Sequence, residues 1–115
     1  MINDSVKIKV GRDASNQLNY NHSSISRFHA AIEINDNGVL IEDNNSKNGT
    51  YVNDRRISKI DLNYGDRLRL GDYRINVEKL LDQLHQYYDS KRTDFKEEFE
   101  EILIHFEKYE ERRKN

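Results

Sequence analysis

Short runs of alternating apolar and polar residues, separated by turn-forming residues, constrain the fold of this chain more than any other feature. Residues 6–10 read Val-Lys-Ile-Lys-Val and end at Gly11, and residues 67–71 and 73–77 repeat the same period of two. Such alternation places one face of a strand in a core and the other in solvent. Two further β-prone runs, 28–34 and 39–42, flank the turn sequence Asp36-Asn37-Gly38. Many short strands joined by turns predict a mainly β protein, an antiparallel sandwich or barrel.

The composition changes at about residue 78. All 5 glycines precede this point, whereas the rest of the chain is rich in Glu, Lys, Leu, Phe and Tyr. Apolar residues in this second part recur at spacings of three and four, which place them on one face of a helix. They are Leu80, Leu81, Leu84, Tyr87, Tyr88, Phe95, Phe99, Ile102, Phe106 and Tyr109. We therefore expect a β-sandwich over 1–78 and an amphipathic helical extension over 79–115, made of two helices, 79–89 and 94–112, or one bent helix.

Three polar segments between the expected strands carry side chains suited to holding an anion. They are Gly11-Arg12, the run Ser26-Arg27-Phe28-His29, and residues 45–53, Asn-Ser-Lys-Asn-Gly-Thr-Tyr-Val-Asn. Together they offer hydroxyl, amide and cationic donors, and none pairs a nucleophile with an evident base.

With residues 62–71, these segments occur in the order and spacing of the signatures of forkhead-associated (FHA) domains. The chain resembles an FHA domain over residues 6–78. The resemblance implies a β-sandwich whose loops at one end bind phosphothreonine in an extended peptide. Only ten residues precede Gly11, so the family's first strand is expected to be missing or reduced to 1–3.

The resemblance assigns roles to several of these side chains. Arg12 and Ser26 match the family residues that contact the phosphate, and Asn48 matches the asparagine that holds the peptide backbone beside the phosphothreonine. A phosphate carries close to two negative charges and three acceptor oxygens, so a guanidinium fork and neutral donors suit it. Arg27 and Lys47 have two interpretations each: they reach the phosphate or a neighbouring peptide residue, or they point into solvent.

His29 and two glycines are expected to support the site. In the family this histidine braces the binding loops, and Gly11 and Gly49 allow tight backbone paths. A hydrolase using Ser26 and His29 is the enzymatic alternative, but the two are only three positions apart and no partner acid is specified. We therefore expect no catalytic residues, no enzyme activity and no cofactor, and the histidine spacing predicts no metal site.

Charge and hydropathy limit the classes of partner. The net charge is −2 and neither part of the chain is a polycation, which argues against nucleic-acid binding. No apolar run is long enough to span a membrane, and the chain has no cysteine, so a cytoplasmic location is the expectation.

The predicted function is phosphothreonine-peptide binding that mediates phosphorylation-dependent protein–protein interaction. The alternative is a phospho-independent scaffold or homo-oligomer formed through the helical extension. A homodimer through that extension, or through the sheet edge that a missing first strand would expose, is part of the same expectation. A third interpretation is that the apolar face of the extension packs against the sandwich itself.

Overall fold

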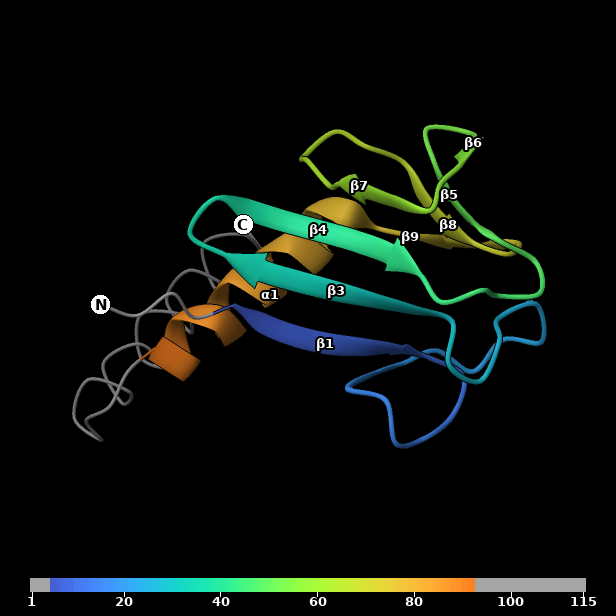
Figure 1. Cartoon of the computed structure of the whole chain (residues 1–115), viewed down its shortest axis with the longest axis horizontal. Helices are drawn as coiled ribbons and strands as arrows, with labels where there is room; N and C mark the ends of the chain where they lie inside the picture. Colours follow the sequence, from blue (N-terminus) through green and yellow to red (C-terminus); the bar gives the residue numbers. More distant parts are fainter. Residues whose placement is uncertain (1–4, 93–115) are drawn as a thin grey trace, which may run out of the picture.

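The computed structural model describes residues 5–92, which form a two-sheet sandwich with a helix along one side (Figure 1). Within these residues lie nine strands and one helix, in this order: β1 (Val6–Gly11), β2 (Leu18–Asn19), β3 (Ala30–Asn35), β4 (Gly38–Asp43), β5 (Thr50–Val52), β6 (Arg55–Arg56), β7 (Lys59–Asp61), β8 (Leu68–Leu70), β9 (Tyr73–Ile75) and α1 (Val77–Arg92). The predicted mainly β fold with a helix after the sandwich is confirmed. No helix in this part of the chain combines the length and the hydropathy that a membrane span requires.

The two sheets have the strand orders β2-β1-β3-β4-β7 and β6-β5-β8-β9. The predicted hairpin joins β3 to β4, with Asn35 opposite Gly38 and the Asn37 amide donating to Asn35 Oδ1 at 2.8 Å. Neighbouring strands are antiparallel except β1 and β2, which pair in parallel through Val10 and Leu18. Strand β2 is not expected from the sequence, because two residues are too few to show a period.

Alternation along the strands divides core from surface as predicted. Ile8 and Val10 of β1 are buried, while Val6, at the start of the strand, is only partly covered. Leu68 and Leu70 of β8 are buried on either side of a half-buried residue. The inward side chains of both sheets form one hydrophobic core.

Phe28 departs from its predicted place at the start of a strand. It is 45% exposed and lies in a turn, and β3 begins two residues later at Ala30. The backbone turns here because the His29 amide donates to the Val10 carbonyl at 2.9 Å, and only from that point does the chain run beside β1. The Phe28 carbonyl instead accepts from Asn44 Nδ2 at 3.1 Å.

Helix α1 completes the core. It begins at Val77, two residues before the predicted start, because the Asn76 side chain caps it by accepting from the Lys79 amide at 3.0 Å. Its buried face consists of Val77, Leu80, Leu81, Leu84 and Tyr88, which belong to the same core as the strands. The Tyr88 hydroxyl also donates to Asp36 Oδ1 in the β3–β4 turn at 2.8 Å. This first part of the extension therefore packs against the sandwich, one of the outcomes that the sequence left open.

Some expectations fall outside the described residues. Residues 1–4, where a reduced first strand would lie, and residues 93–115, which contain the predicted second helix, are not described. Helix α1 continues to Arg92, past the predicted end at 89. A homodimer through the extension or a sheet edge stays a prediction, as does the division at residue 78.

Candidate functional site

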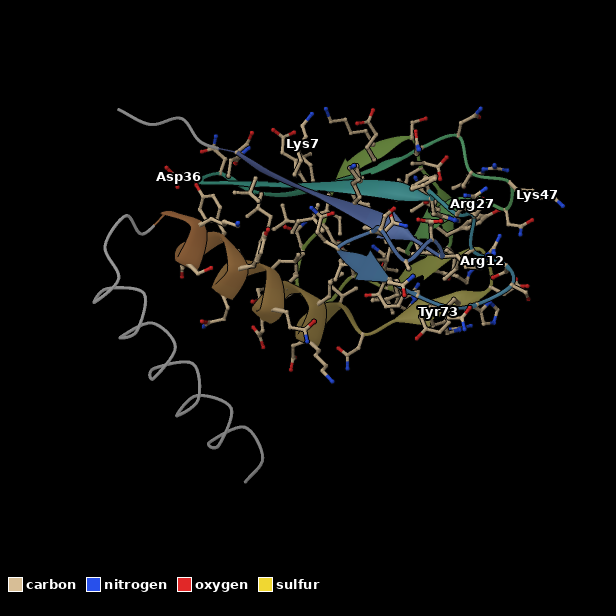
Figure 2. All side chains as sticks on the ribbon, turned by 90° about the horizontal axis from the view of Figure 1, so that it is seen from below. Lys7, Arg12, Arg27, Asp36, Lys47 and Tyr73 are labelled. Atoms are coloured by element: carbon tan, nitrogen blue, oxygen red, sulfur yellow. The ribbon has the colours of Figure 1, made fainter. Side chains whose placement is uncertain are left out.

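The predicted anion-binding segments meet at one end of the sandwich. Figure 2 shows the side chains of Arg12, Arg27 and Lys47 at this end, with helix α1 extending away from it. Backbone hydrogen bonds hold the segments together: the Arg12 amide donates to the Ser26 carbonyl at 3.0 Å, and the Asn44 amide donates to the His29 carbonyl at 2.9 Å. Loops from β1, from the β2–β3 connection and from the β4–β5 connection thus share one surface.

Arg12 is exposed, and its guanidinium is oriented by the backbone. Its Nε donates to the Ile25 carbonyl at 2.9 Å, which fixes the plane of the fork. Within residues 5–92 the terminal Nη groups of Arg12 form no hydrogen bond or ion pair. An arginine held in this way presents two adjacent N–H groups to solvent, the arrangement that binds oxyanions in bidentate fashion.

Ser26 lies between the loops, and its hydroxyl oxygen accepts a hydrogen bond from the Lys47 amide at 3.0 Å. With that lone pair occupied, the hydroxyl hydrogen is directed elsewhere and can donate to a ligand. Lys47 itself is exposed, and its ammonium forms no ion pair with any described carboxylate. Arg12, Ser26 and Lys47 therefore supply donors that no acidic side chain among residues 5–92 neutralises.

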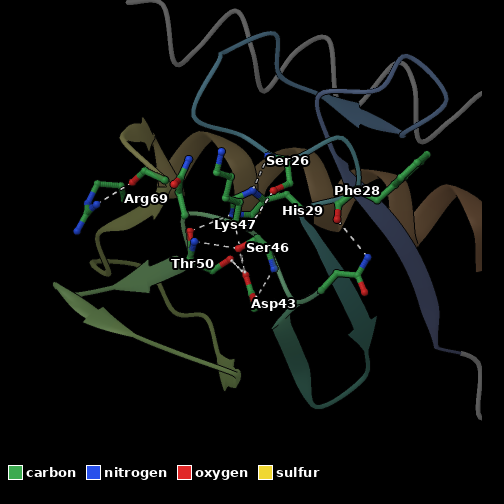
Figure 3. A network of polar contacts seen from close by, with 12 residues as sticks. Ser26, Phe28, His29, Asp43, Ser46, Lys47, Thr50 and Arg69 are labelled. Atoms are coloured by element: carbon green, nitrogen blue, oxygen red, sulfur yellow. Dashed lines mark hydrogen bonds and ion pairs between the residues drawn. The ribbon is translucent and has the colours of Figure 1, made fainter.

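His29 is fully buried and bridges two of the loops (Figure 3). Its Nδ1 accepts from the Ser26 amide at 3.0 Å, and its Nε2 faces the Gly49 carbonyl at 3.0 Å. Only the neutral tautomer with hydrogen on Nε2 satisfies both contacts. Burial lowers the pKa of His29, outweighing the Gly49 carbonyl and the Asp43 carboxylate, which favour the charged form. His29 contacts the amide of Ser26 and not its hydroxyl, so it is not placed to activate that oxygen as a base.

A network around Asp43 holds the β4–β5 loop, and sequence reasoning missed it. Asp43 Oδ1 accepts from the hydroxyls of Ser46 and Thr50 at 2.6 and 2.7 Å, and Oδ2 accepts from the Ser46 amide at 3.0 Å (Figure 3). The Ser46 hydroxyl in turn accepts from the Gly49 amide at 2.9 Å. Burial acts to raise the pKa of Asp43, but these hydrogen bonds outweigh it and lower the pKa. An aspartate three residues before a serine is a turn signal that the sequence did contain.

Asn48 and Gly49 form the end of that loop. Asn48 is exposed, and its Nδ2 donates to the Ser24 carbonyl at 2.9 Å, so the amide is oriented and its Oδ1 accepts from no described donor. Gly49 has φ +89°, and an added Cβ would lie 2.8 Å from Arg56 Nε. The positive φ favours glycine here, and a larger residue would also have to displace the Arg56 side chain.

Gly11 allows the first two loops to approach closely. A Cβ at Gly11 would clash with the Arg27 carbonyl and would lie 2.9 Å from Asn16 Nδ2. Asn16, a second residue that the sequence did not indicate, is buried and donates from Nδ2 to the Arg27 carbonyl at 2.8 Å. The Arg27 side chain lies 3.5 Å from Asp13 and 5.8 Å from the centre of the Phe28 ring. Arg27 therefore differs from the other candidate phosphate-binding residues, because a described carboxylate, that of Asp13, partly offsets its charge.

The described residues contain no group of three or more His, Asp or Glu side chains that could hold a metal ion. A β-sandwich with exposed, preorganised donors on its loops is the architecture of a binding module. The chain belongs to the FHA domain family, whose model matches residues 8–71. FHA domains are binding modules and not enzymes.

Known proteins place the same region in this family. The chain is 32% identical over 65 residues to the ABC transporter ATP-binding/permease protein Rv1747 of Mycobacterium tuberculosis, a match that covers 56% of this chain and 8% of that protein. An FHA domain solved in a study of phosphothreonine-dependent FHA domain interactions is 32% identical, with a TM-score of 0.57, covering 59% of this chain and 71% of that one. The FHA domain of the CT664 protein from Chlamydia trachomatis is 41% identical, with a TM-score of 0.55, covering 58% and 70%.

Proposed function

We propose that this chain binds phosphothreonine in a partner protein and so mediates phosphorylation-dependent protein–protein interaction. The observation that carries the proposal is that Arg12 and Ser26 are both oriented as donors. The Ile25 carbonyl orients the Arg12 guanidinium, and the Ser26 hydroxyl oxygen already accepts a hydrogen bond from the Lys47 amide. Both groups therefore present hydrogen-bond donors at a surface that three loops share. A similar FHA domain was studied for phosphothreonine-dependent interactions, which supports the same ligand class here.

In the proposed complex each side chain has a separate task. The Arg12 guanidinium takes two phosphate oxygens, and the Ser26 hydroxyl donates to another. Lys47 adds positive charge at the edge of the phosphate. Arg27 contributes after exchanging its contact with Asp13, which is 3.5 Å away and partly exposed, so the exchange is inexpensive. Gly11, His29 and Gly49 hold the loops in place.

The peptide backbone beside the phosphothreonine binds to Asn48. An amide side chain both donates to a carbonyl and accepts from an N–H, and Asn48 is exposed, with no described donor to its Oδ1, for the second task. In the proposed complex the threonine methyl contacts the surface beside Asn48. Selection of threonine over serine then depends on one methyl group, worth about 1 to 3 kcal/mol.

The proposal includes a cytoplasmic location and the absence of any catalytic role. ATP, the phosphate donor for a protein kinase, is available in the cytoplasm. His29 is buried and bonded to the Ser26 amide at 3.0 Å, which supports a binding role for this pair over hydrolysis.

Matched peptides test the function. A phosphothreonine peptide library is screened by fluorescence polarisation, and the best peptide is compared with its unphosphorylated and phosphoserine forms. We expect the phosphothreonine form alone to bind tightly and to raise the melting temperature. Arg12→Ala and Arg12→Lys are expected to abolish binding, because lysine keeps the charge but not the fork. Arg55→Ala, at an exposed position on β6, is the control. Equal binding of phosphorylated and unphosphorylated peptides would contradict the proposal.

A further inference from the structure

A continuous row of side chains crosses the outer face of the four-stranded sheet. The pairings place Arg56 of β6 opposite Tyr51 of β5, Tyr51 opposite Arg69 of β8, and Arg69 opposite Arg74 of β9. Tyr51 and Arg69 are half-buried and flanked along their strands by buried residues, so the row faces away from the core. The outer face of this sheet therefore carries three arginines and one tyrosine in register.

The positive charge of this row is largely uncompensated within the described residues. Arg56 and Arg74 are exposed and form no ion pair there. The Arg69 guanidinium lies 4.0 Å from the centre of the Tyr51 ring and donates to the Gly71 carbonyl at 2.7 Å, so neutral groups hold it in place. Like charges directly opposite in neighbouring strands, as Arg69 and Arg74 are, destabilise a sheet. The positions of Arg69 and Arg74 are therefore unfavourable for folding but suited to binding an anionic ligand.

The row begins beside the candidate site. The Arg56 guanidinium lies so close to Gly49 that a Cβ there would be 2.8 Å from its Nε. The Gly71 amide donates to the Gly49 carbonyl at 2.8 Å, which joins the loop after β8 to the same point. A groove of about 350 Å³ lies on the same sheet and is lined by the other three members of the row, Tyr51, Arg69 and Arg74, among others. Figure 3 shows Arg69 next to the loop network that contains Lys47 and Thr50.

We infer that this row, Arg56, Tyr51, Arg69 and Arg74, docks an acidic stretch of the same partner chain that carries the phosphothreonine. A peptide held at Asn48 passes Gly49, and its next residues reach Arg56 first and the groove after it. Carboxylates at these positions pair with the exposed arginines, while the fixed Arg69 gives the row its central charge. The inference rests on the proposed function and adds a preference for acidic sequence beside the phosphothreonine.

A protein segment fits this surface better than a nucleic acid. One face of the Tyr51 ring is already covered by Arg69 at 4.0 Å, so a base has only the other face to stack on. Asp54, Asp66 and Glu78 line the groove, and Arg67 is paired with Asp54 at 3.1 Å. These carboxylates limit the positive stretch to a few arginines, which suits a few glutamates or aspartates and not a long phosphate backbone.

The test uses the full chain and three phosphothreonine peptides that differ only in the flanks. One has glutamine flanks, one has a run of glutamates before the phosphothreonine, and one has the run after it. We expect one glutamate peptide to bind about threefold to tenfold more tightly than the glutamine peptide at low salt, with a smaller gain at high salt. Arg56→Gln with Arg74→Gln is expected to remove the gain and leave glutamine-peptide binding unchanged.

Lys7→Gln with Lys9→Gln is the matched control, because it removes the same charge from exposed positions of β1 in the other sheet. The inference is overturned, and the proposed function stands, if the glutamine peptide binds and neither glutamate run improves on it. It is also overturned if the gain survives the double arginine variant, or if a single-stranded oligonucleotide displaces the bound glutamate peptide through the same arginines. If none of the three peptides binds, the proposed function itself fails.

Discussion

The Ser26 hydroxyl accepts a hydrogen bond from the Lys47 amide at 3.0 Å, although 21 positions separate the two residues. This contact ties the β2–β3 loop to the β4–β5 loop at the surface where the phosphate is proposed to bind. Together with the His29 contacts to Ser26 and Gly49, it joins the two loops through side-chain hydrogen bonds. Preorganised donors bind a ligand with less loss of conformational entropy than donors that must first be ordered.

The first prediction follows from that contact. Ser26→Ala removes both the donor to the phosphate and the acceptor for the Lys47 amide. We expect phosphopeptide affinity to fall at least about tenfold, because the lost hydrogen bond is to a charged phosphate. We expect the free energy of unfolding to fall by about 1 kcal/mol, because the bond lost within the protein is between neutral groups. Peptide titration and urea unfolding measure the two effects. Ser26→Thr keeps the hydroxyl and is the control; unchanged affinity in the alanine variant would remove Ser26 from the site.

A second prediction concerns pH. The folded protein holds His29 neutral, and burial lowers its pKa below the value of 6.5 for an exposed histidine. The unfolded chain therefore binds a proton before the folded chain does, so stability is fully present above about pH 6.5 and decreases as the pH falls from there toward the lower, folded-state pKa. His29 alone can change the free energy of unfolding by at most about 1.4 kcal/mol per pH unit.

Urea unfolding at a series of pH values measures that slope. His29→Gln lowers stability at every pH, since it removes a buried bridge, but it is expected to lose the part of the slope that His29 contributes below pH 6.5. The variant and the parent are compared by slope and not by absolute stability, which separates titration from packing. Identical slopes in the two proteins would show that His29 titrates equally in both states.

The third prediction separates backbone strain from crowding at two glycines. Gly49 has φ +89° and a Cβ there would lie 2.8 Å from Arg56 Nε, whereas Gly65 has φ +92° and open space around it. Gly65→Ala is expected to cost about 1 kcal/mol, from the left-handed conformation alone. Gly49→Ala should cost more, and adding Arg56→Ala should recover part of the difference. Thermal unfolding of the three variants decides; equal losses at the two glycines would mean that Arg56 moves aside freely.

The sequence predicts the strands well where a run is long enough to show its period. The alternation in β1 and β8 indicates their buried residues, and Asp36-Asn37-Gly38 indicates the β3–β4 turn. The two-residue strand β2 is too short for any period to be read. The sequence wrongly predicts Phe28 at the start of a strand, because it is apolar and adjoins a β-prone run. Nothing local indicates that the hydrogen bond from the His29 amide to the Val10 carbonyl will turn the chain there.

The candidate site is only partly encoded in local patterns. Arg12, Ser26 and Asn48 are indicated by the motifs around them, but the orientation of Arg12 depends on the Ile25 carbonyl 13 positions away. The supporting bonds of Asn16 to the Arg27 carbonyl and of Asp43 to Thr50 join residues 11 and 7 positions apart. Loop residues separate the partners in each pair, so no continuous strand or helix period in the sequence connects them. The arginine row is likewise invisible in the sequence, because its four members come from four strands whose register only the fold defines.

The last prediction addresses how far the sandwich depends on helix α1. The chain ending at Glu78 loses Leu80, Leu81, Leu84 and Tyr88, all buried in the same core as the strands, and removing even one buried leucine costs about 2 to 5 kcal/mol. We therefore expect it to melt at a much lower temperature than the full chain or to aggregate, whereas the chain ending at Arg92 keeps α1 and should melt as a folded unit. Differential scanning calorimetry measures the melting temperatures of the full chain and of the two shortened chains, and sedimentation shows whether each is monomeric. A chain ending at Glu78 that is monomeric and melts with the full chain would mean that the strands alone close the core.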